Sequence, residues 1–269
     1  MYSTILFRGD LDTEGELDVC KSLMPTVEYR SQIVSDSLVI GRYSVLPFYE
    51  ELDRELKLSD SMLINSWKQH SYIASMMSWV EHLGDLTPKT WKTWQNLPEG
   101  AYVLKGATNS RKQSWLTHMF CPNLASIPSV SRRLYDDSLL IDQGIVIREY
   151  VPLVKLDEGL NGLPITNEWR CFFLGKRLLA KGYYWGTHPE AMEKAAWTDE
   201  AMSVAQKAAD IVSNHVNFFV IDVAETQSGR WIVVEINDGQ MSGLSTIPPI
   251  DLYTELHKST VLESFSPIR

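Results

Sequence analysis

Two apolar segments near the C-terminal end of the chain, residues 218–223 and 231–237, have the length and composition of β-strands. Both are rich in β-branched and aromatic residues and are bounded by turn formers, which predicts a buried β-hairpin. With Ser228 and Gly229 as a two-residue turn, antiparallel pairing places Asp222 directly opposite Glu235. Two carboxylates that face each other in apolar strands repel, so the pattern indicates a positive charge between them.

The same strand carries a third oxygen-bearing side chain. Asn237 lies two residues beyond Glu235 and therefore on the same face. Carboxylate and amide oxygens without His or Cys suit Mg²⁺ or Mn²⁺ rather than zinc. From the hairpin alone, an ordinary core hairpin explains the pattern equally well, with Asp222 at a strand end and Glu235 paired with an arginine.

A second hairpin is predicted at residues 168–174 and 177–181, with Gly175 and Lys176 as another two-residue turn. This turn places Arg170 opposite Lys181. Two facing cations indicate an anion between them, and phosphate is a suitable one. The alternative is that both side chains extend from an exposed face into water.

Short strands and helices alternate through the rest of the chain. The pattern predicts strands at residues 3–7, 36–40, 62–65, 101–106 and 145–153, and helices at 46–57, 66–83, 189–214 and from Asp251 to about 258. Pro47 occupies an early position of the first helix, and Gly84 ends the second. A short aromatic helix with Trp91 and Trp94 is also expected. The first 88 residues thus predict a small α/β lobe.

The strand at 101–106 carries Lys105, and the small polar loop after it carries Arg111 and Lys112. Such a loop either follows a phosphate with its backbone N–H groups or is a solvated turn. The strand at 145–153 is halted by Pro152, which leaves backbone donors and acceptors free for an adenine edge, although a plain edge strand has the same pattern. Cations, carboxylates and free backbone together are what a bound MgATP requires.

The composition places limits on these interpretations. A chain of 269 residues, 44% hydrophobic and with a net charge of −9, is typical of a soluble globular protein and disfavours broad nucleic-acid binding. Three scattered cysteines form no disulfide framework, and the N-terminus lacks the pattern of a secretion signal. No apolar run approaches the ~20 residues of a membrane span. A cytoplasmic location is therefore expected, and none of the six histidines is nominated for a site.

The sequence resembles the ATP-grasp superfamily from about Asn65 to Leu244. The matching features are Asn65 with its helix, the segment 87–90, the strand lysine Lys105, the hinge 148–152, Arg170 in Asn167-Glu168-Trp169-Arg170, and the metal ligands Asp222, Glu235 and Asn237. More narrowly, one arginine with two lysines resembles a divergent clade of bacterial and phage ATP-grasp proteins related to the eukaryotic assembly factor for translation initiation factor 2. The glycine-loop region is shorter than in larger members.

This resemblance implies an α/β (α+β) ATP-grasp fold of three small lobes with mainly antiparallel sheets, at residues 1–88, 89–150 and 151–269. It implies that ATP and Mg²⁺ (or Mn²⁺) bind between the second and third lobes. The residues implied to hold ATP are Lys105, Lys112, Glu149, Tyr150, Val151, Arg170 and Lys181, with Lys105 and Arg170 also catalytic.

The implied reaction transfers the γ-phosphoryl group to a carboxylate, and an amine or similar nucleophile then attacks the acyl phosphate. The acceptors include a peptide or a protein, and ADP and phosphate are released. An ATP-binding chaperone or assembly factor with little turnover is the alternative, and a kinase that stops at phosphorylation is a third possibility.

Overall fold

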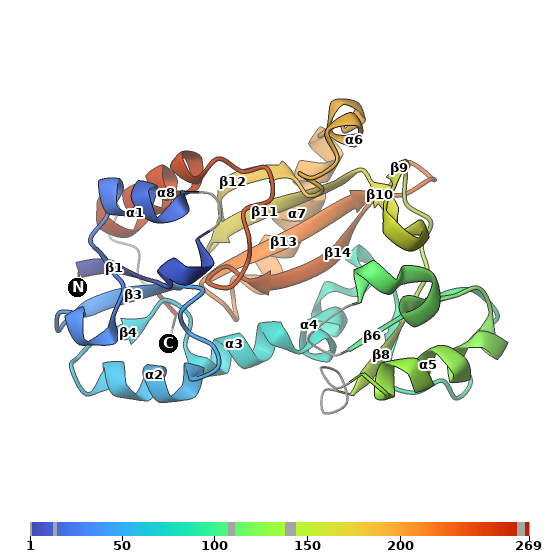
Figure 1. Cartoon of the computed structure of the whole chain (residues 1–269), viewed down its shortest axis with the longest axis horizontal. Coiled ribbons are helices and arrows are strands. Elements are labelled where there is room, and N and C mark those ends of the chain that lie inside the picture. The colour runs from blue at the N-terminus through green and yellow to red at the C-terminus, as the bar shows by residue number, and fades with distance from the viewer. Residues whose placement is uncertain (1, 13–14, 107–110, 138–143, 263–266, 269) are drawn as a thin grey trace.

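The computed structural model describes the chain except residues 1, 13–14, 107–110, 138–143, 263–266 and 269. Three four-stranded sheets, formed in turn by the beginning, middle and end of the chain, make up most of the fold (Figure 1). The predicted division into lobes at residues 88 and 150 follows these sheets and stays a prediction. No helix in the described part of the chain is long and apolar enough to cross a bilayer.

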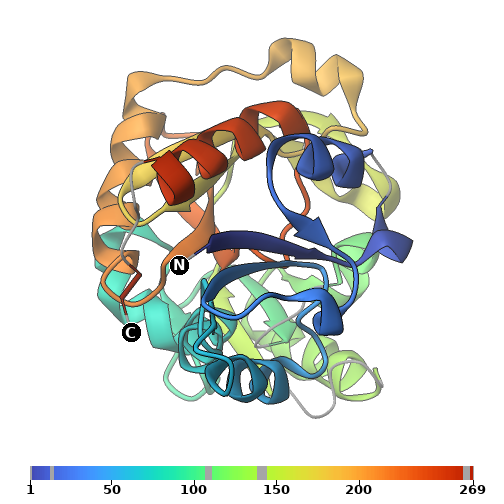
Figure 2. The same ribbon diagram turned by 90° about the vertical axis from the view of Figure 1, so that its left-hand side faces the viewer.

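The N-terminal sheet is parallel, with the strand order β2-β1-β3-β4. Its strands are β1 (Tyr2–Phe7), β2 (Thr26–Val27), β3 (Ser37–Arg42) and β4 (Met62–Leu63). Figure 2 shows this sheet between α1 (Glu16–Leu23) and α8 (Pro249–His257) on one side and α2 (Tyr49–Lys57) on the other. The predicted helix at 46–57 begins three residues late, so Pro47 precedes it. Asp251 lies in the first turn of α8 and does not cap it.

The middle sheet is antiparallel, with the order β5-β8-β6-β7, and α5 (Ile127–Tyr135) packs on it. Its strands are β5 (Thr90–Trp91), β6 (Tyr102–Gly106), β7 (Phe120–Cys121) and β8 (Ile145–Glu149). The predicted aromatic helix around Trp91 is wrong. Trp91 pairs with Ile147 as an edge strand and packs on the same core, because burial of the indole in the sheet outweighs local helix propensity.

The C-terminal sheet is antiparallel and has the order β12-β11-β13-β14. Its strands are β11 (Glu168–Leu174), β12 (Arg177–Tyr183), β13 (Phe218–Glu225) and β14 (Trp231–Asp238). The helix α7 (Asp199–Val212) covers one face, and residues of β1, β3, α1 and α8 pack on the other. A small separate sheet pairs β9 (Lys155–Glu158) with β10 (Pro164–Thr166).

Two predicted long helices are each broken in two. Residues 66–83 form α3 (Trp67–Ala74) and α4 (Met76–Leu83), with extended backbone at Ser75 between them. Residues 189–214 form α6 (Pro189–Lys194) and α7, separated by residues 195–198, and Thr198 caps α7. The pair α3–α4 runs from the N-terminal sheet to the middle sheet (Figure 1).

Both predicted hairpins form, but each contains a β-bulge that changes its register. In the second hairpin the Gly175-Lys176 turn is confirmed, since Leu174 pairs with Arg177. A bulge at Leu179 then moves Arg170 opposite Gly182, so the predicted facing of Arg170 and Lys181 is wrong.

In the hairpin β13–β14, the loop has three residues, 227–229, and the predicted two-residue turn is wrong. A bulge at Val234 compensates for the extra residue. Asp222 therefore pairs with Glu235, as predicted.

Candidate functional site

The centre of the site is a buried ion pair between neighbouring strands of the C-terminal sheet. Arg170 on β11 pairs with Asp222 on β13, and its guanidinium donates two hydrogen bonds to the carboxylate, at 2.9 and 2.8 Å. Asp222 is fully buried. A third bond, from Arg170 Nη1 to the Gly243 carbonyl at 2.9 Å, holds the loop after β14 against the pair.

A second ion pair joins the middle and C-terminal sheets. Lys105 on β6 donates to Glu235 on β14, and both side chains are largely buried. Burial alone would raise the pKa of Glu235, but Lys105, Lys112 and Arg170 lower it to about 2. Glu235 is therefore ionised at neutral pH and lies among three cations.

One cavity opens between the middle and C-terminal sheets, and its walls include Glu149, Tyr150 and Val151 of the predicted hinge. The N–H groups of Glu149 and Tyr150 are already donated to the carbonyls of Lys89 and Ala101. Within the described part of the chain, the Val151 N–H makes no hydrogen bond, so it remains available to a ligand. Apolar side chains line the same cavity and suit a flat ring; they include Met119, Leu163 and Ile232.

A second cavity lies on the other side of the Lys105–Glu235 pair, which lines both cavities. Arg170 and Asn237 lie on its wall with the side chains of α3 and α4. A group bound in the first cavity therefore meets a group bound in the second at Lys105 and Glu235. This is an arrangement for transfer of a charged group from one to the other.

The predicted cations do not all reach the site. Lys112 does, since its ammonium lines the first cavity, donates to the Tyr184 hydroxyl at 2.7 Å and lies 4.2 Å from the centre of that ring. Lys181 does not. Its ammonium lies over Trp169 and Trp197, on the face opposite Arg170, because the bulge at Leu179 shifts the alternation of side chains. Residues 107–110 of the predicted phosphate loop lie outside the described residues.

Sequence reasoning assigned no role to two buried charged side chains of the first cavity. Arg148 on β8 donates to the Thr87 hydroxyl at 2.6 Å and to the Val234 carbonyl. Burial lowers the pKa of Arg148 to about 10, although Glu235 opposes this shift. Burial raises the pKa of Glu168 to about 7 against the effect of Lys112, and its Oε1 has no hydrogen-bond partner in the described part of the chain. The sequence did contain a signal for Glu168, two residues before Arg170 on the same strand face.

The predicted metal ligands come together as expected from the hairpin. Asp222 faces Glu235, and Asn237 shares their face because it pairs with Val220. Among the described residues no three His, Cys, Asp or Glu side chains form a metal group, so the third oxygen here is an amide. Each Asp222 oxygen accepts one N–H from Arg170 and keeps a lone pair. Two carboxylates and one amide fit Mg²⁺ or Mn²⁺, whose remaining positions phosphate oxygens and water can fill.

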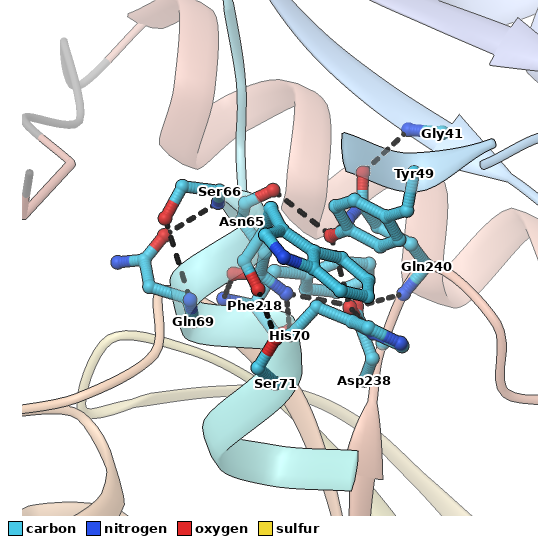
Figure 3. A network of polar contacts seen from close by, with 12 residues as sticks. Gly41, Tyr49, Asn65, Ser66, Gln69, His70, Ser71, Phe218, Asp238 and Gln240 are labelled. Carbon is cyan, nitrogen blue, oxygen red and sulfur yellow. Dashed lines mark hydrogen bonds and ion pairs between the residues drawn. The ribbon is translucent and has the colours of Figure 1, made fainter. Parts of the chain in front are cut away.

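The loop after β14, which the sequence did not single out, begins with another buried acid. Asp238 accepts hydrogen bonds from Asn65 Nδ2 at 2.8 Å and Tyr49 Oη at 3.1 Å, and its Oδ2 lies 3.0 Å from His70 Nδ1 (Figure 3). Asn65, placed at the start of α3 by the family resemblance, also donates to the Phe218 carbonyl at 2.6 Å. This network fastens α2 and α3 to the hairpin that carries the predicted metal ligands.

Comparison with solved structures identifies the fold. D-cycloserine synthetase DcsG matches with a TM-score of 0.60 and 11% identity, covering 96% of this chain and 99% of that one. An ATP-grasp protein with a RimK domain from Sphaerobacter thermophilus matches with a TM-score of 0.57 and 13% identity over 95% and 98%. The ATP-grasp ligase PsnB, in complex with a minimal precursor, Mg and ADP, matches with a TM-score of 0.57 and 9% identity over 97% of each chain.

At these identities the likeness shows the fold alone, a mixed α/β ATP-grasp fold with antiparallel sheets. Among curated proteins, no sequence matches this chain. The model of one sequence family does match, at residues 92–256, and it describes an ATP-grasp domain, family 3 of the clade named for one arginine and two lysines. This match spans more than half of the chain and contains Lys105, Arg170, Asp222 and Glu235. The chain therefore belongs to the ATP-grasp proteins, in family 3 of this arginine and two-lysine clade.

Proposed function

We propose that this protein is an ATP- and Mg²⁺-dependent ligase that joins a carboxylate to an amine or similar nucleophile. The observation that carries the proposal is the position of Lys105 and Glu235 on the walls of both cavities. ATP occupies the first cavity, with its adenine edge at the Val151 N–H. The acceptor occupies the second cavity, and the γ-phosphate lies between them.

In the first step a carboxylate oxygen of the acceptor attacks the γ-phosphorus. A new P–O bond forms, the bond to the β-phosphate oxygen breaks, and ADP leaves with that electron pair. Lys105 and Lys112 offset negative charge on the phosphates, and Arg170 reaches the reacting group from the acceptor side. Asp222, Glu235 and Asn237 would hold Mg²⁺, which when bound offsets phosphate charge that the side chains do not reach.

The second cavity favours the ligase over an assembly factor that only binds MgATP. A binding module needs no acceptor cavity beside the γ-phosphate, whereas here such a cavity has Arg170 as its own cation. A peptide or protein acceptor, a cytoplasmic location and a link to the assembly factor for translation initiation factor 2 stay predictions.

The nucleotide product tests this proposal. The protein is incubated with ATP, Mg²⁺ and a pool of the twenty amino acids, their N-acetyl forms and tryptic peptides, with hydroxylamine to trap acyl phosphates as hydroxamates. We expect ADP, phosphate and hydroxamates, and we expect Glu235→Gln to lose all three. Release of AMP would contradict the proposal, and so would tight MgATP binding without stimulated turnover, which would favour the assembly factor.

A further inference from the structure

His70 lies in the first half of α3, on the wall of the second cavity. Its ring packs between two aromatic rings, with centroids 4.4 Å from Tyr49 and 5.7 Å from Trp67, nearly parallel to both (Figure 3). Its side chain is only 12% exposed. The imidazole is therefore held in one orientation at the edge of the cavity that the acceptor would occupy.

The carboxylate of Asp238 determines which ring nitrogen carries the proton. Asp238 is 4% exposed, and its Oδ1 already accepts from Asn65 Nδ2 and from the Gln240 N–H at 2.9 Å. Its Oδ2 accepts from the Tyr49 hydroxyl and lies 3.0 Å from His70 Nδ1. An ionised carboxylate only accepts hydrogen bonds, so Nδ1 carries the hydrogen and the lone pair of a neutral ring is on Nε2.

The second ring nitrogen is not used by the fold. Within the described part of the chain, His70 Nε2 makes no hydrogen bond, although the ring is nearly buried. A structural histidine in a network this complete would need only Nδ1. The lone pair on Nε2 instead belongs to a ring that shares its cavity with Lys105, Glu235 and Arg170.

We propose that His70 is the general base that takes a proton from the acceptor amine in the second half of the reaction, an inference that rests on the proposed function. A primary amine is mostly protonated at neutral pH and cannot attack until it loses a proton. His70 Nε2 takes one of the three N–H protons. The free amine attacks the carbonyl carbon, the C–N bond forms and the C–O bond to phosphate breaks. One proton remains in the amide, and the other leaves on hydrogen phosphate.

The test separates the two halves of the reaction by the nucleophile. Hydroxylamine is already unprotonated at neutral pH and needs no base, whereas L-leucinamide is an ammonium ion whose own carboxyl group is blocked. With the N-acetyl amino acids as carboxylates, His70→Asn is expected to form hydroxamates at close to the native rate. Its amide formation with leucinamide should fall by about a hundredfold or more.

His70→Asn keeps a donor for Asp238, since the asparagine Nδ2 replaces Nδ1. His70→Gln is assayed beside it with the same expected pattern, and melting temperatures identify a variant that has not folded. The matched control is His82→Asn, on α4, whose ring stacks 4.7 Å from His215 and lines neither cavity. Both reactions of this control should match the native protein.

Three results would count against the inference. Full leucinamide ligation by a folded His70 variant would overturn it, and equal loss of hydroxamate and amide would reassign His70 to structure or to the first step. A native protein that forms no hydroxamate would instead contradict the proposed ligase, and the inference with it.

Discussion

At the scale of single residues, the site combines charges whose burial is compensated with one whose burial is not. Asp222 and Glu235 each have a cation beside them, whereas Glu168 has an orphaned oxygen and a pKa raised to about 7. A carboxyl group with a raised pKa in the folded chain stabilises it fully below its ordinary pKa of 4.5. That stability is lost as the pH rises through about 7.

Glu168→Gln removes this titration and keeps the shape of the side chain. Relative to the native protein, the variant should gain on the order of 2 kcal/mol in free energy of unfolding between about pH 5 and pH 8, because Gln stays neutral. Urea unfolding at both pH values measures the change. An equal difference between the two proteins at both pH values would show that Glu168 is not protonated in the folded chain.

The cations give a second prediction at this scale, with a control from the same sheet. Lys105→Ala and Arg170→Ala should each weaken ATP by about tenfold to a hundredfold, because a charge-assisted bond to phosphate contributes ~1.5–3 kcal/mol, and should leave adenosine nearly unchanged. Lys181→Ala should change neither affinity, since its ammonium lies over Trp169 and Trp197.

Calorimetric titration with both ligands measures these affinities. If Lys181→Ala weakens ATP as much as Lys105→Ala does, the side-chain directions given by the β12 register are incorrect. If Lys105→Ala weakens adenosine equally, Lys105 is a structural residue.

At the scale of elements, the two hairpins show what the sequence can and cannot predict. Apolar runs located all four strands, because burial of both faces leaves a long β-branched pattern. Turn chemistry was right for Gly175-Lys176 and wrong for the loop at 227–229. Neither bulge could be predicted, because Leu179 and Val234 are ordinary strand residues that become bulges only when they pack.

The loop at 227–229 depends on Gly229, whose φ of +84° favours glycine. Gly229→Ala should lower the free energy of unfolding by about 1 kcal/mol, although no atom lies within 4 Å of the added Cβ. The matched control is Gly100→Ala, which has equal space and no left-handed φ and should stay within about 0.5 kcal/mol. Chemical denaturation of the three proteins compares them, and equal losses in both variants would argue against the left-handed conformation at Gly229.

At the scale of the whole molecule, the site lies where segments distant in sequence meet. The sequence identified Lys105, Arg170, Asp222 and Glu235, each on a predicted strand. It gave no role to the side chains of Arg148, His70 or Asp238, because their partners come from other sheets and helices, and no local pattern distinguishes them from solvated charges. The family resemblance pointed to Asn65 without its physical role.

The structure supplies that role, since Asn65 joins the N-terminal segment to the hairpin β13–β14. Its side chain is fully buried and bonds the Phe218 carbonyl, Asp238 and the N–H groups of residues 217 and 218. Asn65→Ala leaves these groups unpaired and should cost on the order of 3 kcal/mol of unfolding free energy. Asn214→Ala, at the exposed end of α7, should cost about 0.5 kcal/mol. Similar losses from the two variants in urea unfolding would contradict the joining role of Asn65.

The central claim is that a phosphoryl group passes from the first cavity to a carboxylate in the second. The most direct measurement uses acceptor carboxylates labelled with oxygen-18 and follows the label in the released phosphate. The account predicts one labelled oxygen in each phosphate, because the bond to the acyl carbon breaks and the carboxylate oxygen stays on phosphorus. Phosphate released without label would mean that water attacks ATP directly, and it would contradict the ligase.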